Sequence, residues 1–386
     1  MAKSVLITGA RAAAALDVAR DFAAAGWQVH LADSVKSRMA RWSNLRAVHH
    51  LYPAPRHNRV AFRAEIERLV GAHQIDLIVP TCEEVFHLSA PDLSRSVSTK
   101  LFAPALDQLR ELHDKLRFAR LAQGCGVSVP ESHAIAREGD MEQFAVDSRN
   151  WVFKPRLSRF GEQALIGPSP DELRSVRGTL DKGWMAQRRI KGREVCLHAI
   201  AHHGRLVGFA SYASEWRMGG GACFAFEPLP DADQDGLRAI AEAIVSKAGL
   251  HGQFGFDAIF DGDGTAHLIE CNPRATSGLH LLTGKGRAAN AIAQGQPIGA
   301  SGSSTAYLGP AMFLFGLPRA VAKRRLGAWW QCLQSGSDVI GAKGDALPVA
   351  GAMWDALCFS IKGWRHRIST TAATTHDIEW NGEELA

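Results

Sequence analysis

The sequence predicts an α/β protein in which a parallel, doubly wound sheet precedes a region of mixed helices and strands. Three observations support this prediction. Strand-like and helix-like runs alternate through the first hundred residues, and strands dominate a later stretch between residues 184 and 226. The length of 386 residues is the third, because a single hydrophobic core rarely serves so long a chain.

The alternation begins with a short apolar strand at Val5 to Ile7, which an amphipathic helix follows. A strand at Val29 to Leu31, a helix over residues 62–72 and a strand at Leu77 to Val79 come next. Strands separated by helices of this length are typical of parallel pairing. We therefore expect a Rossmann-like layer over residues 1–108, with ligands near the carboxyl ends of its strands.

Those carboxyl ends carry Gly9, Asp33 and the acidic pair Glu83 and Glu84. Asp33 stands where a dinucleotide-binding protein has its ribose-binding acid. The glycines of such a site are missing, because Arg11 and then alanines follow Gly9, and their side chains block close approach to a pyrophosphate. We therefore favour a Rossmann-like layer with a structural role and without a bound dinucleotide. Glu83 and Glu84 are expected to bind a substrate ammonium group, to act as a base, or to cap a helix.

Composition excludes several other classes of protein. The net charge of +5 is too mild to indicate nucleic-acid binding, and no apolar run approaches the length of a membrane span. The N-terminus lacks the features of a signal peptide, so a cytoplasmic location is expected. Seven scattered cysteines without a C-x-x-C pair disfavour a structural zinc site. Neighbouring strand residues point to opposite faces, so we interpret His49-His50 and His202-His203 as surface or loop histidines.

The region after residue 108 is predicted to fall into three parts, at 109–186, 187–300 and 301–386. The expected elements are a helix over 109–122, an extended segment over 127–136, a strand over 151–155, a helix over 170–180, strands within 184–226, a helix over 233–248 and a hairpin over 255–272.

The hairpin, GFDAIFDGDGTAHLIECNPRATSG from residue 255 to 278, carries the strongest chemical pattern. Asp257 lies on its first strand, an Asp- and Gly-rich turn follows, and the second strand ends in Glu270 and Asn272. Since strand side chains alternate, Glu270 and Asn272 share a face, and Asp257 comes to lie across from them. Two carboxylates and an amide oxygen suit a magnesium ion that carries phosphates. An ordinary acidic hairpin is the alternative.

Four segments in this order resemble the motifs of the ATP-grasp superfamily, which includes carboxylate–amine ligases and carbamoyl-phosphate-synthase-like proteins. They are HDKLRFARLA, WVFKP, WMAQRRIKGREVCL and the hairpin with its ECNPR, and together they span about residues 115 to 278. The resemblance implies a two-lobed α+β ATP-grasp domain after the Rossmann-like layer. It also implies ATP and Mg²⁺ as cofactors, with Mn²⁺ as an alternative ion.

The resemblance assigns further roles. Lys115 would contact the nucleotide phosphates, Lys154 the α-phosphate and adenine, and Glu194 the ribose hydroxyls. Backbone groups of a hinge strand would face adenine; that strand consists of Gln187, Arg188, Arg189 and Ile190.

The loop after Lys154 departs from the family pattern. Family members often have a glycine-rich stretch there, whereas this chain has RLSRFGEQALIG with Gly161 as its central glycine. We expect Ser158, Arg159 and the backbone around Phe160 and Gly161 to cap the phosphates instead.

In the reaction that the resemblance implies, a substrate carboxylate attacks the γ-phosphate of ATP, and an amine then displaces phosphate from the acyl phosphate. Arg274, beside the metal, and Arg217, in the loop from Ser214 to Gly221, are the candidates for holding the acyl phosphate and the substrate carboxylate. A plain surface turn is the alternative for Arg217. A bicarbonate-using carboxylase or carbamoyl-phosphate-like enzyme, and a nucleotide-binding regulator without turnover, are the alternatives for the whole chain.

The extension at residues 301–386 is basic and rich in tryptophan. Trp354, Leu357 and Ile361 repeat at helical spacing, so we expect them to pack against the body of the protein. Contact with an acyl chain or a carrier protein is the alternative for this extension. The expected partners of the chain are small carboxylates and amines, and a homodimer is left open.

Overall fold

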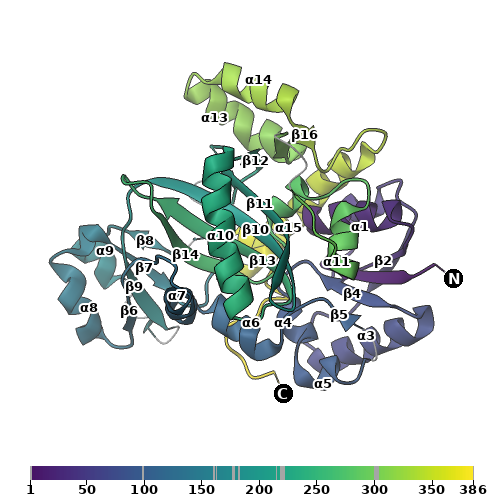
Figure 1. The fold of residues 1–386 in the computed structure, drawn as a ribbon, viewed down its shortest axis with the longest axis horizontal. Coiled ribbons are helices and arrows are strands. Elements are labelled where there is room, and N and C mark those ends of the chain that lie inside the picture. Colours follow the sequence, from purple (N-terminus) through teal and green to yellow (C-terminus); the bar gives the residue numbers. More distant parts are fainter. Residues whose placement is uncertain are drawn as a thin grey trace.

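The structure is a computed structural model that describes residues 2–97, 100–159, 161, 163–175, 179–180, 183–213, 215–217, 222–299 and 304–385. Within these ranges the strands form three sheets (Figure 1). The predicted fold class, a parallel sheet followed by a mixed α+β part, is confirmed.

The N-terminal sheet is parallel, with the strand order β3-β2-β1-β4-β5. Its strands are β1 (Ser4–Thr8), β2 (Gln28–Asp33), β3 (Ala47–Leu51), β4 (Leu77–Pro80) and β5 (Lys100–Leu101). The sequence predicted β1, β2 and β4 but missed β3. This edge strand has half-buried and exposed side chains, so it lacks the apolar run that marks a buried strand. His49 and His50 therefore lie on a strand, and their interpretation as loop residues was wrong.

Helices cover both faces of this sheet, as the alternation of buried side chains requires. Val5 and Ile7 pack with α1, whereas Leu6 packs with α3 on the other face. The helices are α1 (Ala13–Ala24), α2 (Arg38–Arg41), α3 (Arg59–His73), α4 (Val85–Leu88) and α5 (Pro91–Ser94).

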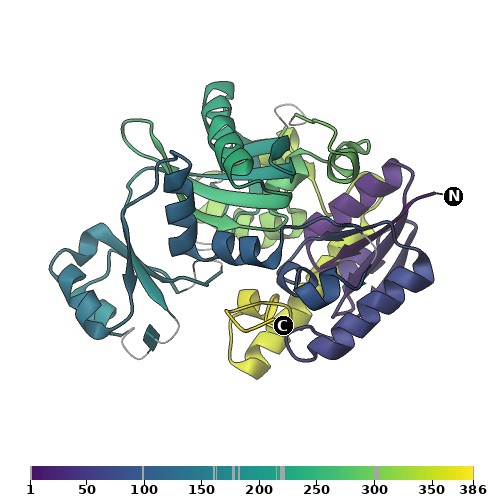
Figure 2. The ribbon, with the colours of Figure 1, turned by 60° about the horizontal axis from the view of Figure 1, so that its bottom comes forward.

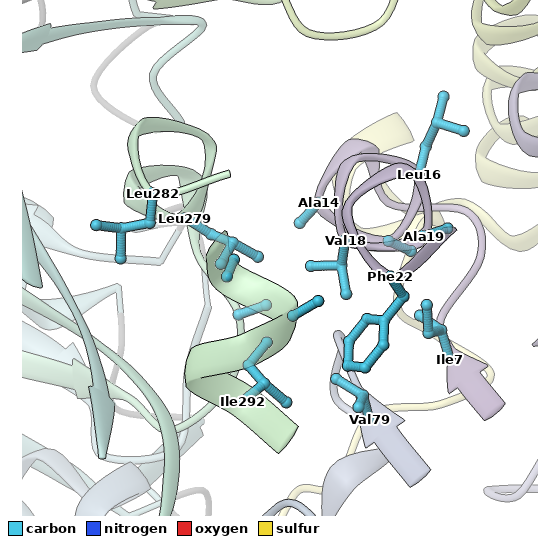
Figure 3. Packing of buried hydrophobic residues seen from close by; sticks show 14 of the residues in the cluster. Ile7, Ala14, Leu16, Val18, Ala19, Phe22, Val79, Leu279, Leu282 and Ile292 are labelled. Atoms are coloured by element: carbon cyan, nitrogen blue, oxygen red, sulfur yellow. The ribbon is translucent and has the colours of Figure 1, made fainter. Parts of the chain in front are cut away.

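Helix α1 joins the N-terminal sheet to the rest of the molecule. Figure 3 shows Phe22 directed toward Ile7 and Val79 of the sheet, with Ile292 of α11 (Arg287–Gln294) beyond it. The buried carboxylate of Asp21 accepts hydrogen bonds from three backbone amides at the start of α11, at 2.6–3.0 Å. A charged group that would be costly to bury alone thus satisfies the amino end of a helix and fixes the junction.

The second sheet is small, with the strand order β6-β9-β7-β8. Its elements are β6 (Ser132–Ile135), α8 (Glu138–Ala145), η1 (Ser148–Asn150), β7 (Trp151–Pro155), β8 (Leu165–Ile166), α9 (Pro170–Arg174) and β9 (Trp184–Arg188). The helix predicted over 170–180 is shorter, since α9 ends at Arg174, and residues 176–178 lie outside the described ranges.

The third sheet is mostly antiparallel and has the strand order β14-β13-β10-β11-β12-β15-β16. Its strands are β10 (Arg193–His202), β11 (Arg205–Ala213), β12 (Ala225–Pro228), β13 (Gly252–Phe260), β14 (Ala266–Asn272), β15 (Ala306–Tyr307) and β16 (Ser337–Asp338). The long helix α10 (Asp231–Lys247) crosses this sheet (Figure 1), and η3 (Ser277–Leu281) follows β14.

The helix predicted over 109–122 is broken in two, at Asp114. Helix α6 (Leu106–His113) ends there, and Asp114 caps α7 (Lys115–Gly124) by accepting from the amides of Leu116 and Arg117. Both helices pack on the large sheet, whose core includes apolar side chains from each. Lys115 is consequently the first residue of a helix rather than a position in the middle of one.

The C-terminal region extends the large sheet and then returns to the N-terminal domain. It contains α12 (Gly309–Ala311), the π-helical turn η4 (Met312–Gly316), α13 (Leu317–Ala322), α14 (Leu326–Ser335), α15 (Leu347–His366) and α16 (Thr370–Ala373). Figure 2 shows its final part running against the N-terminal domain. In the described part of the chain, no helix is both long enough and apolar enough to cross a bilayer.

Helix α15 packs on α2 through its small residues and one carboxylate. Asp355 accepts from the backbone amides of Arg38 and Met39 at 2.9 and 3.0 Å, and a side-chain carbon at Gly351 would meet the backbone of Arg38 at 2.6 Å. We expected the apolar stripe of this helix to pack against the body of the protein, and this expectation was wrong. Its residues are 43–54% exposed; they are Trp354, Leu357 and Ile361.

Candidate active site

The predicted hairpin is present as β13 and β14, and it gathers the three predicted metal ligands. Asp257 pairs with Glu270 and Gly255 with Asn272 across the two strands. Asn272 Nδ2 lies 3.4 Å from Asp257 Oδ2. Cys271 is buried in the apolar core on the other side, so the predicted alternation of the second strand holds.

The two carboxylates of the hairpin, those of Asp257 and Glu270, repel each other, and their pKa values differ as a result. Partial burial and then the charge of Glu270 raise the pKa of Asp257 above its ordinary value. Burial also acts to raise the pKa of Glu270, but the charges of Lys115 and Lys154 outweigh it and lower that pKa. The cations therefore neutralise one carboxylate well and leave the other short of positive charge.

Two buried lysines converge on this hairpin from different elements. Lys115, at the start of α7, lies with Nζ 3.4 Å from Glu270 Oε2 and donates to the carbonyl of Ser158 at 2.6 Å. Lys154, on β7 of the small sheet, donates from Nζ to the carbonyl of Ile269 at 3.3 Å. Burial lowers the pKa of Lys154 to about 8. The small sheet and the hairpin thus meet at a cationic patch.

The loop after β7 begins at this patch. Ser158 turns its hydroxyl back to the carbonyl of Pro155 at 3.0 Å, while its own carbonyl accepts from Lys115. Gly161 has a φ of 65°, a left-handed conformation that glycine adopts without strain. Phe160, which we also expected to cap phosphates, lies outside the described residues.

The strand expected to face adenine is the end of β9 and the two residues after it. The amides of Arg188 and Arg189 donate to main-chain carbonyls of the flanking segments at 2.7 and 2.8 Å, and the side chain of Gln187 is buried. Ile190 follows as a half-buried residue. Recognition of a base in this geometry would have to use groups other than those two amides.

Glu194 and Arg217, which were expected at different ends of the substrate complex, form an ion pair with each other. Arg217 is largely buried, its side chain 17% exposed, and its carbonyl accepts from Arg319 at 2.9 Å. Ser214 and the glycines that follow Arg217 lie outside the described residues. Any ligand hydroxyl that Glu194 binds must therefore share the carboxylate with Arg217.

Comparison with protein families identifies this arrangement of hairpin, lysines and hinge strand. The ATP-grasp domain family matches residues 112–278, a range that contains all of them. Residues 112–278 form an ATP-grasp domain. The predicted family is thereby confirmed for this part of the chain.

Solved structures share this ATP-grasp fold. N5-carboxyaminoimidazole synthetase from Staphylococcus aureus, complexed with ADP, has a TM-score of 0.65 at 14% identity over 83% of this chain and 86% of that one. The biotin carboxylase domain of Hydrogenobacter thermophilus 2-oxoglutarate carboxylase, in complex with MgADP and bicarbonate, has a TM-score of 0.61 at 14% identity over 77% and 71%. L-amino acid ligase from Bacillus licheniformis has a TM-score of 0.58 at 13% identity over 75% and 74%. Identities this low show the fold alone, and no curated protein matches the sequence.

Arg274 connects the ATP-grasp domain to the N-terminal sheet. Its Nε donates to Glu83 Oε1 at 2.9 Å, and its Nη2 lies 3.4 Å from Asn272 Oδ1. Arg159, from the loop after β7, lies with Nε 2.9 Å from the other oxygen of Glu83. Burial acts to raise the pKa of Glu83, but Arg159 and Arg274 outweigh it and hold that pKa far below its ordinary value. One buried carboxylate therefore holds two arginines next to the hairpin.

The C-terminal segment, residues 376–385, anchors Arg159 from the opposite side. Arg159 Nη1 donates to Asn381 Oδ1 at 2.8 Å, and Nη2 hydrogen-bonds to the carbonyl of Trp380. The ring of Trp380 stacks on Phe86 with centroids 5.0 Å apart. Sequence reasoning missed this contribution, because nothing in the local pattern links residues more than 200 positions apart.

Glu84 is placed differently from Glu83. Its carboxylate is fully buried and accepts from Thr8 Oγ1 at 2.6 Å and from the amides of Thr81 and Cys82 at 3.2 and 3.3 Å. Burial raises its pKa. These contacts tie together the ends of β1 and β4, which favours the structural alternative for Glu84.

Proposed function

We propose that the chain is a cytoplasmic, magnesium-dependent ATP-grasp ligase that activates a carboxylate as an acyl phosphate and joins it to an amine, releasing ADP and phosphate. One observation carries the proposal: Lys115 and Lys154 converge from separate elements on Glu270, beside Asp257. Phosphoryl transfer needs positive charge around the β- and γ-phosphates and a metal ion that bridges their oxygens. The lysines meet the first need, and the hairpin fits the second.

The residues of the hairpin fit Mg²⁺. Asp257, Glu270 and Asn272 offer hard oxygen atoms on one face, and the raised pKa of Asp257 is consistent with a carboxylate that is short of positive charge. Mn²⁺ accepts the same ligands and is the alternative ion. When bound, such an ion neutralises and orients the phosphates. Lys115 and Lys154 would hold the polyphosphate of ATP in line with the incoming carboxylate.

Arg274, Arg159 and Glu83 support an amine and a carboxylate as the substrates. Two guanidinium groups can bind a carboxylate or an acyl phosphate, while the carboxylate that they share can receive an ammonium group. Glu83 would then release one of its two arginine partners and bind the ammonium group of the substrate. In this proposal Arg274 stabilises the acyl phosphate, and Arg217 keeps Glu194 oriented toward the nucleotide.

A screen for ADP release tests this proposal. Carboxylic acids are paired with amines, with and without bicarbonate, and products are identified by mass spectrometry. Amine-dependent ADP release with a mass that equals acid plus amine minus water is the expected result, and Glu270→Ala should abolish it. Strict dependence on bicarbonate would favour the carboxylase alternative. Binding of magnesium–ATP without ADP release across the panel would favour the non-catalytic regulator.

The exposed apolar stripe of α15 supports contact with an acyl chain or an acylated carrier protein. Trp354, Leu357 and Trp364 are 50%, 54% and 81% exposed, and contiguous apolar surface of this kind marks interaction sites. A Trp354→Ser/Leu357→Ser double variant should raise the KM for long acyl substrates and leave short ones unchanged. Equal effects on both would contradict this contact. Deleting the whole C-terminal region would be a poor test, because residues 376–385 also hold Arg159.

A further inference from the structure

Three histidines meet at the outer edge of the N-terminal sheet, away from every residue assigned to the ATP-grasp reaction. His30 lies on β2, His50 on β3, and His73 is the last residue of α3. One ring nitrogen from each lies within 4.8 Å of the other two. The closest pair is His30 Nδ1 and His50 Nε2, at 2.9 Å. Sequence reasoning missed this group, because its members come from three separate elements.

The three rings are packed closely together. The centroids of His30 and His50 are 5.2 Å apart, and His73 lies 4.7 Å from each. Strands and the end of a long helix supply all three, so their backbones are held by the sheet and by the core beneath it. A constellation on rigid elements keeps its geometry when a ligand arrives.

Apart from the contact between His30 Nδ1 and His50 Nε2, one ring nitrogen of the buried member of the cluster is left unpaired within the described part of the chain. His30 is 1% exposed, and its Nε2 is buried without a hydrogen-bond partner among the described residues. A buried polar nitrogen left without a partner is costly, and each such case calls for an explanation. An ordinary core histidine would have both nitrogens satisfied.

Two of the three rings, those of His30 and His50, favour the neutral form that binds metals. Burial and then the neighbouring imidazoles lower the pKa of His30 to about 4, and burial followed by His73 lowers the pKa of His50. These two rings are therefore neutral at neutral pH, the form in which an imidazole nitrogen can ligate a metal. Among the flanking charges, Arg68 pairs with Glu65 at 2.7 Å, and this carboxylate offsets part of the positive charge near His50.

We propose that His30, His50 and His73 form a binding site for a zinc-class transition-metal dication, with water as a fourth ligand. Three nitrogen ligands distinguish this site from the all-oxygen hairpin, because imidazole prefers zinc, copper and nickel whereas carboxylate and amide oxygens prefer magnesium. Around a tetrahedral ion with Zn–N distances near 2.0–2.1 Å, the nitrogens stand about 3.3 Å apart. Small side-chain rotations from the observed spacing reach that arrangement.

Such an ion would tie the edge strand β3 to β2 and to the end of α3. Edge strands are the weakly held members of a sheet, and β3 has no apolar run of its own. A metal that binds the folded state and not the unfolded one adds its binding free energy to the free energy of unfolding. The expected role of the metal is therefore to stabilise the N-terminal domain. Catalysis at the hairpin should not depend on it.

Zinc uptake by the full chain tests the site. Protein stripped with a chelator and saturated with magnesium–ATP is titrated with Zn²⁺, and bound zinc is measured by elemental analysis after gel filtration. Wild type should retain one zinc per chain that His50→Gln and His73→Gln each fail to retain. The expected affinity loss exceeds the 10–100-fold that is typical of second-shell partners. His49→Gln is the matched control, because it changes the adjacent histidine on the opposite face of β3.

A thermal melt supplies a second readout that does not depend on activity. Zinc should raise the Tm of wild type and of His49→Gln by a few degrees and leave the Tm of the other two variants unchanged. Equal melting temperatures without zinc would show that the glutamine variants fold normally. Absence of zinc binding in wild type would overturn the proposal, and so would zinc uptake by His50→Gln or His73→Gln that equals the uptake by wild type.

Discussion

Two groups of acidic side chains in this protein are neutralised in different ways. In the hairpin, half-buried Asp257 and Glu270 face each other, and the two nearby lysines leave Asp257 with a raised pKa. At the carboxyl end of the N-terminal sheet, buried Asp33 and Asp377 share Arg11, whose Nη1 lies 2.9 Å from Asp377 Oδ1. Lys362 adds a second cation to Asp377 at 2.9 Å.

The difference indicates that the hairpin is a ligand-binding site, whereas the cluster around Arg11 is a structural contact. The N-terminal cluster is complete in itself and fills the position near Asp33 where a Rossmann-like layer would bind a ligand. The hairpin is incomplete, since its two lysines lower the pKa of Glu270 and leave that of Asp257 raised. Unresolved repulsion among half-buried carboxylates lowers stability and persists where function requires it.

The largest expected effect is a loss of ATP turnover on substitution in the hairpin, which substitution in the Arg11 cluster should not cause. Glu270→Gln should reduce ADP formation about 1,000-fold, because it removes a charged metal ligand and the partner of Lys115. Its free energy of unfolding in urea should fall less than that of Arg11→Met, because Glu270 is only half-buried and its neutralisation also relieves the repulsion from Asp257. A loss of stability as large as the loss of activity would mean that the hairpin is a structural clamp as well.

Arg11→Met should show the opposite pattern. It leaves two buried carboxylates without their shared cation, which should cost about 3–5 kcal/mol of unfolding free energy. The folded fraction should still form ADP. Arg238→Met is the control, because its pair with Glu242 is exposed and should contribute less than about 1 kcal/mol. Equal destabilisation by both variants would remove the distinction between the clusters.

A pH series sharpens the comparison. The pKa of Asp257 is about 7 in the folded chain and near 4 in the unfolded chain. The metal-free folded state therefore loses stability as the pH rises from about 4 to about 7. Asp257→Asn should abolish that slope, so its stabilising effect on the metal-free protein should be about 2 kcal/mol larger at pH 8 than at pH 5. Urea midpoints in chelator-containing buffer measure it. A pH-independent difference between wild type and variant would show that Asp257 carries no such strain.

The smallest expected effect concerns Glu194 and Arg217. Arg217→Gln frees Glu194 to move, so the KM for ATP should rise about fivefold while kcat changes little, as for the loss of one hydrogen bond of about 1 kcal/mol. Glu194→Gln should act similarly, and the double variant should be no worse than either single one. Additive losses would mean that the two residues act independently.

Local patterns predicted what local structure determines. The alternation and turn of the hairpin placed Asp257, Glu270 and Asn272 on one face, as the strand pairing shows. The order of motifs predicted the family that matches residues 112–278. Lys115 was found through its motif, although the break in the helix at Asp114 was not foreseen.

Contacts between distant segments escaped prediction. Arg159 and Trp380 meet across more than 200 positions, and the three histidines of the N-terminal edge come from separate elements. The periodicity of α15 indicated an apolar face but could not say whether anything covers it. Sequence periodicity reports on single elements, whereas these features depend on how the elements are assembled.

The anchoring of Arg159 by residues 376–385 has a consequence for synthesis and turnover. These residues are translated after every other described part of the site, so a nascent chain can form the hairpin and both lysine contacts before the loop after β7 is secured. A protease that cuts the chain just before this segment would return the loop to that earlier state and would also remove Asp377 from Arg11. The positions of Arg159 and Arg11 thus depend on a segment that is synthesised after the rest of the site.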